Sequence, residues 1–69
     1  MENEVLIVEG MHCEKCKNRV ESALDGLAGV IAVEVDLGAN TVDVTYDSDL
    51  VNHDAIRNCI EAQGYVVVV

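Results

Sequence analysis

Residues 5–27, VLIVEGMHCEKCKNRVESALDGL, join a strand pattern to a helix pattern through a short loop. Val5 to Val8 form an apolar, β-branched run that ends at Glu9-Gly10, which is typical of a strand. After the loop, apolar side chains recur with helical spacing at Cys16, Val20, Ala23, Leu24 and Leu27. Gly26 and Gly29 are expected to end this helix. The stretch therefore predicts a strand followed directly by an amphipathic helix.

The middle of the chain has the alternating pattern of a β-hairpin. Val33, Val35 and Leu37 alternate with acidic residues, which predicts a strand with one buried face and one face in water. A turn is expected at residues 38–40, Gly-Ala-Asn, and a second alternating strand follows at Val42, Val44 and Tyr46.

A second helix is predicted after the hairpin. Asn52 or Asp54 can cap its start. Gly64 is expected to end it, and residues 65–69 are expected to form a last short strand. The apolar stripe of this helix consists of Ala55, Ile56, Cys59 and Ile60.

The predicted order of elements is β-α-β-β-α-β without an internal linker. It indicates an α+β fold, the ferredoxin-like sandwich of a four-stranded antiparallel sheet with two helices on one face. We expect residues 1–69 to form a single domain. This connectivity gathers residues 10–16, the turn near Ala39 and Gly64-Tyr65 at one end of the sandwich, with His53 at the opposite end.

Composition limits the classes of function. The core must be aliphatic, because the 69 residues include no Phe or Trp and two Tyr. A formal net charge of −9 argues against nucleic acid and anionic membranes as partners. No apolar run approaches the roughly 20 residues of a membrane span, and the start, Met-Glu-Asn-Glu, does not resemble a signal peptide. We therefore expect a cytoplasmic protein whose cysteines are thiols.

The loop between the first strand and the first helix contains a CxxC motif, Cys13 and Cys16. This spacing lets two sulfurs bind one ion when the first cysteine lies in the loop and the second in the helix. Cys16 belongs to the apolar stripe and should be half-buried, whereas Cys13 should be exposed. Thiolates bind metals, and soft sulfur selects Cu(I), with Zn(II) also compatible.

Three of the four basic residues, Lys15, Lys17 and Arg19, cluster around this motif. Together with the positive end of the helix dipole they lower the pKa of nearby thiols. They also give an acidic molecule a positive pole at the motif, where we expect them to meet carboxylates of a partner.

The motif Gly10-Met11-His12-Cys13-Glu14-Lys15-Cys16 resembles the GMxCxxC signature of heavy-metal-associated domains. The likeness extends over essentially the whole chain, including Gly29-Val30 and Gly64-Tyr65. The family includes copper chaperones, the N-terminal domains of copper- and zinc-exporting P-type ATPases, and mercury-binding proteins. The resemblance implies a metal-binding function, and Tyr at position 65 is typical of the family's bacterial members.

Several neighbouring residues allow two interpretations. Met11 could bind Cu(I) through its thioether, but core packing is favoured, and the family usually buries this Met. His12 is expected to point to solvent, although it could add a third ligand for zinc. Tyr65 could hydrogen-bond the sulfurs and tune the site. Cys59 is expected in the core, and His53 on the surface.

The favoured function is a non-enzymatic Cu(I) chaperone that delivers copper by ligand exchange to the metal-binding domain of a copper-transporting P-type ATPase. The alternatives are a sensor domain of such an ATPase or of a mercuric reductase, and a binder of Zn(II), Cd(II) or Hg(II). A thiol oxidoreductase is less favoured, because the chain is short and contains no proline. A structural zinc site normally needs four ligands, and there is no second CxxC.

Self-association is expected by two routes. One metal ion could bridge two copies through Cys13, which would give a metal-bridged homodimer. Alternatively, Val5, Ile7 and alternate members of Val66 to Val69 should form an exposed apolar patch on the open face of the sheet, and such patches often mark contact surfaces.

Overall fold

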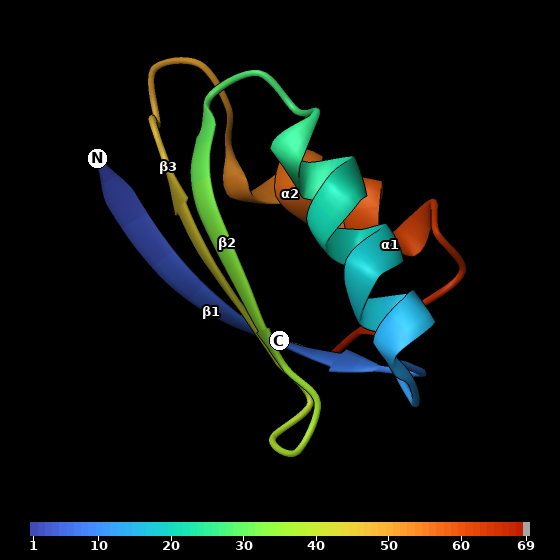
Figure 1. The fold of residues 1–69 in the computed structure, drawn as a ribbon. Coiled ribbons are helices and arrows are strands. Elements are labelled where there is room, and N and C mark those ends of the chain that lie inside the picture. The colour runs from blue at the N-terminus through green and yellow to red at the C-terminus, as the bar shows by residue number, and fades with distance from the viewer. Residues whose placement is uncertain (69) are drawn as a thin grey trace.

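A computed structural model describes residues 1–68 and contains the predicted order of elements. The strands are β1 (Glu2–Glu9), β2 (Val30–Asp36), β3 (Thr41–Tyr46) and β4 (Val66–Val67), and the helices are α1 (Glu14–Asp25) and α2 (His53–Glu61). The strands form one antiparallel sheet in the order β2-β3-β1-β4. Both helices lie on the same face of this sheet (Figure 1), which confirms the predicted ferredoxin-like arrangement.

The core lies between the sheet and the helices and is mostly aliphatic. Alternation decides which side chains enter it: on β1, Leu6 and Val8 are buried while Val5 and Ile7 face away from the helices. The helices contribute their apolar stripes to the same layer. The buried side chains are Leu6, Val8, Met11, Val20, Leu24, Val35, Val42, Val44, Tyr46, Val51, Ile56, Ile60 and Tyr65.

The helix ends agree with the sequence signals except at the end of α2. This helix stops at Glu61 with Ala62 as its C-cap, so Gly64, which was expected to end it, lies in the turn that follows. Gly26 is the C-cap of α1. Asn52, one of the two predicted caps, begins α2, because its side-chain oxygen accepts a hydrogen bond of 2.8 Å from the backbone N–H of Ala55. This bond satisfies one of the otherwise unpaired donors of the first helical turn.

Two predicted strand ends are wrong. β2 stops at Asp36, so Leu37 belongs to the turn. β4 is limited to Val66 and Val67, whereas a strand over residues 65–69 was expected; Val69 lies outside the described residues. The physical reason for the late start of β4 lies in β1: Val66 pairs with Glu9, and the next residue, Gly10, leaves the extended conformation with φ +103°.

The ends of the sandwich are arranged as the connectivity predicts. The hairpin turn meets the end of β1, where the Val8 N–H donates to the Asn40 carbonyl at 2.8 Å. The start of α1 and the segment before β4 lie at this same end, and the N-terminus lies at the other (Figure 1). Neither helix in residues 1–68 has the length and apolar character required to cross a membrane.

Candidate metal centre

The CxxC loop joins two rigid elements. β1 ends at Glu9, Gly10 turns the chain, and Cys13 is the N-cap residue of α1 with extended backbone, φ −150°. The Lys17 N–H donates to the Cys13 carbonyl at 3.1 Å, which closes the first helical turn around Cys16. One cysteine is therefore in the loop and the other in the helix, as the sequence predicts.

The two sulfurs are adjacent. Cys13 Sγ and Cys16 Sγ are 3.1 Å apart, within hydrogen-bonding distance, and both are free thiols. Cys13 is exposed and Cys16 is half-buried against the core. Because Cys13 faces solvent, its side chain can move to accept an ion between the sulfurs, and an incoming ligand can reach that ion.

Hydrogen bonds at the loop favour the thiolate form of Cys16. Hydrogen bonding from the Tyr65 hydroxyl, followed by that from Cys13 and from the backbone at His12, lowers the pKa of Cys16 to about 7. Partial burial opposes this effect without cancelling it. At neutral pH a substantial fraction of Cys16 is therefore already the metal-binding species.

Tyr65 is the largest influence on the pKa of Cys16. Its side chain is buried, with 9% exposed, and its hydrogen bond to Cys16 and its burial both raise the pKa of the phenol. The hydroxyl therefore stays protonated and remains a donor to the sulfur. That Tyr65 tunes the sulfurs during metal binding stays a prediction.

The other residues of the loop separate into core and surface. Met11 is 1% exposed and packs in the core, so the structure favours the packing interpretation over that of a ligand. His12 is exposed, as expected. Within residues 1–68, no three His, Cys, Asp or Glu side chains converge as a ligand set. The donor set at this end of the molecule consists of the two thiols.

The basic cluster lies beside the sulfurs on α1. Lys15 and Arg19 are exposed and Lys17 is half-buried. In the part of the chain that the structure describes, ion pairs are formed by His53 and Arg57, and none by these three residues. Their charges are thus available to a partner that approaches the loop.

Cys59 and His53 lie outside the centre. Cys59 packs partly buried against the core, and its thiol donates to the Ala23 carbonyl of α1 at 3.4 Å, which favours the predicted packing role. Burial raises the pKa of this thiol, the opposite of the shift at Cys16. His53 is partly buried and pairs with Glu4 of β1 at 2.8 Å, a contact that its interpretation as a surface residue did not include.

Sequence reasoning missed the part played by Gly10. A Cβ at this position would lie 3.1 Å from Tyr65 Cδ1, so the Tyr65 ring packs against the bare backbone of the loop. The glycine is visible in the motif, but its contact depends on the pairing of β1 with β4. No local sequence signal could have indicated it.

Comparison with known proteins identifies the family of this chain. The sequence profile of the heavy-metal-associated domain matches residues 5–65. The chain belongs to the heavy-metal-associated domain family. It is 51% identical to the copper chaperone CopZ of Staphylococcus haemolyticus, over 97% of this chain and 98% of that protein.

Solved structures of this family agree closely with the fold. A CopZ metallochaperone superposes with a TM-score of 0.95 at 45% identity, covering 97% of this chain and 100% of its own. A copper-binding domain from HMA7, a P-type ATPase, superposes with a TM-score of 0.94 at 35% identity, covering 100% of this chain and 96% of its own. The chain thus resembles both a carrier and an ATPase domain.

Proposed function

We propose that this protein is a Cu(I) chaperone that binds one ion between Cys13 and Cys16. The observation that carries the proposal is the pair of free thiols 3.1 Å apart in an exposed loop, with the pKa of one lowered to about 7. Two soft sulfur donors suit Cu(I), whereas structural zinc sites normally take four ligands. The copper chaperone with 51% identity over nearly the whole chain supports this choice of metal and role.

The geometry also suits transfer. Exposure of Cys13 lets a thiolate of the target bind the ion before either original sulfur has left. Each exchange then forms one copper–sulfur bond and breaks another, with no change in oxidation state. Cys16, held in α1 and half-buried, is the sulfur expected to leave last. The protein is therefore a carrier whose cargo is the ion, rather than an enzyme.

The partner that this chemistry fits is a second domain with the same kind of loop. We propose the metal-binding domain of a copper-transporting P-type ATPase, which the likeness to the HMA7 domain supports. Lys15, Lys17 and Arg19 surround the loop and would contact carboxylates on that domain. Because the loops must meet for exchange to occur, these side chains lie at the rim of the contact.

The test is a competitive Cu(I) titration against a soluble chelator. The native protein should bind one ion per chain at low concentration, and Cys13→Ser or Cys16→Ser should each abolish tight binding. Cys59→Ala is the matched control and should keep the affinity within about tenfold, or 1.4 kcal/mol. Tight Cu(I) binding by the double serine variant would refute the site, and displacement of Cu(I) by an equal amount of Zn(II) or Cd(II) would refute the choice of metal.

A metal-bridged homodimer follows from the same exposure of Cys13. Two copies that share one ion would each contribute that side chain, so association should require Cu(I). Sedimentation velocity of the apo and copper-loaded protein measures this directly. A monomer at substoichiometric copper would contradict the bridged dimer without affecting the proposed metal site.

A further inference from the structure

The face of the sheet opposite the helices carries four exposed apolar side chains on β1, β4 and the residue after β4. Their exposed fractions are 55% for Val5, 42% for Ile7, 57% for Val66 and 53% for Val68. Ile7 and Val68 are direct neighbours, because the Val68 N–H donates to the Ile7 carbonyl at 2.8 Å. We call these four residues the apolar row. A contiguous exposed apolar surface of this kind often marks a contact site.

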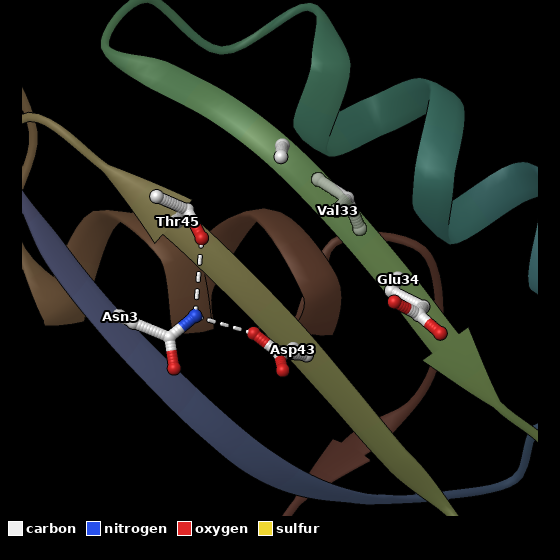
Figure 2. A pocket seen from close by; sticks show the side chains of 6 residues that line it. Asn3, Val33, Glu34, Asp43 and Thr45 are labelled. Atoms are coloured by element: carbon white, nitrogen blue, oxygen red, sulfur yellow. Dashed lines mark hydrogen bonds between the residues drawn. The ribbon is translucent and has the colours of Figure 1, made fainter.

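The other half of this face, on β2 and β3, is acidic. Glu34 and Asp43 are paired directly across the two strands, an arrangement that destabilises a sheet when the charges are alike. Figure 2 shows both side chains here, with the Asn3 amide hydrogen-bonding Asp43 and Thr45. Asp36 follows on β2 and Glu9 lies at the end of β1.

No lysine or arginine balances these carboxylates. All four of these residues in the chain lie on the helices, at Lys15, Lys17, Arg19 and Arg57. The charges of the molecule are therefore separated. The helices carry all the lysine and arginine side chains, and the open face of the sheet combines the apolar row with four acidic side chains. An approaching partner meets an apolar strip beside a negative one.

A second copy of this chain does not fit that surface. A stable interface buries about 800 Å² on each partner and involves some 20–30 residues, whereas the apolar row has four. Two copies would have to include the acidic half of each, which would bring eight carboxylates together without a lysine or arginine. Like charges brought together in a contact cost several kcal/mol. Self-association through this face, which the sequence suggested, is therefore disfavoured.

We propose that the open face docks an amphipathic basic helix of a partner protein. Its apolar side would cover the apolar row, and its Lys or Arg side chains would meet Glu34 and Asp43. From Val5 to Glu9 β1 extends about 13 Å, which a helix of some nine residues spans. Docking here leaves Cys13 and Cys16 accessible at the end of the molecule, so the inference does not rest on the proposed function.

The experiment uses ¹⁵N-labelled protein and a synthetic helical Leu–Lys peptide with one apolar and one basic side. We expect amide shifts confined to the sheet, at residues of β1 and β4 beside the apolar row and at Glu34 of β2 and Asp43 of β3. Glu34→Gln with Asp43→Asn should weaken binding about fivefold or more. Asp25→Asn with Asp49→Asn, which removes the same charge from exposed positions off the sheet, is the control and should leave binding within about twofold.

Ile7→Thr with Val68→Thr tests the apolar half and should also weaken binding. Equal binding of a matching Leu–Glu peptide, or shifts centred on the helices, would overturn the proposal. So would dimerisation of the apo protein through the sheet, seen by sedimentation. Cu(I) titration of the same variants should be unchanged, which separates failure of this surface from failure of the metal site.

Discussion

The ring of Tyr65 packs against the backbone of Gly10, so closely that a Cβ on residue 10 would lie 3.1 Å from Tyr65 Cδ1. This contact joins the two ends of the chain, because Gly10 follows β1 and Tyr65 precedes β4. The same tyrosine lowers the pKa of Cys16, so one aromatic ring affects both the protonation of a proposed metal-binding thiol and the shape of its loop.

Gly10→Ala should therefore disturb the site as well as the fold. The added methyl group must displace the ring, and the residue also has φ +103°. Gly64→Ala is a matched control with a similar φ of +95° and no atom within 4 Å of the added Cβ. Gly64→Ala should lower the free energy of unfolding by about 1–2 kcal/mol, and Gly10→Ala should lower it further, because the ring must also move. Only Gly10→Ala should weaken Cu(I) binding in addition, and equal affinities in the two variants would show that the contact is unimportant.

Tyr65→Phe should raise the pKa of Cys16 from about 7 toward its ordinary value, because the largest cause of the lowering is removed. The rate of thiol alkylation against pH, followed by mass spectrometry at Cys16, measures this shift. Tyr46→Phe is the control, since Tyr46 is also buried and its hydroxyl interacts with Glu4 instead. A Cys16 titration that is the same in all three proteins would exclude the hydrogen bond.

The lowered pKa of Cys16 also makes stability depend on pH. Between about pH 7 and pH 9 the unfolded chain holds a proton on this thiol that the folded protein has released. The apo protein should therefore become more stable as the pH rises through this window, and lose that contribution as the pH falls through 7. Thermal unfolding of the native protein and of Cys16→Ser, compared at each pH, isolates the effect. A constant difference between them would contradict it.

The fold could be predicted from the sequence because its elements have local signals. These signals each involve residues that are close together in the sequence: the alternation on the hairpin, the helical stripe from Cys16 to Leu27 and the cap at Asn52. The length of β4 could not be predicted, because Val66 to Val68 are alike in composition and their pairing is limited by where β1 ends. Strand length there is a property of the partner strand.

Part of the candidate site could also be predicted from the sequence, and part of it could not. The motif identifies Cys13 and Cys16, and the helical spacing correctly indicates which of them is half-buried. The contact of Gly10 with Tyr65 and the pair formed by Glu4 and His53 join residues far apart in the chain, so no spacing rule reveals them. Such long-range pairs can be predicted only when the register of the sheet is known.

The pairing of Glu34 with Asp43 has a consequence for stability. Because like charges face each other across β2 and β3, Glu34→Gln should stabilise the protein by about 0.2–1 kcal/mol. Urea unfolding measures the change. In an Asp43→Asn background the same substitution should give little or no gain, because the repulsion has already been removed. A gain that persists in that background would have to come from another source.

The last prediction concerns how the basic cluster acts during transfer. Charges at the rim of a contact mainly change the association rate and are screened by salt. Lys17→Glu with Arg19→Glu should therefore slow copper transfer to an ATPase metal-binding domain several-fold at low salt, with Cu(I) affinity nearly unchanged.

Two single substitutions distinguish the effect of where a charge lies from the effect of the net charge of the protein. Arg19→Glu and Arg57→Glu each replace one positive by one negative charge, which takes the net charge from −9 to −11. Arg19 lies on α1 near the sulfurs, whereas Arg57 lies on α2 and forms long ion pairs of 3.8 and 3.9 Å with Asp54 and Glu61. Only Arg19→Glu should slow transfer clearly, and the difference should shrink as salt is added. If both slowed transfer equally, overall charge would account for the effect, and the place of Arg19 near the sulfurs would play no part in transfer.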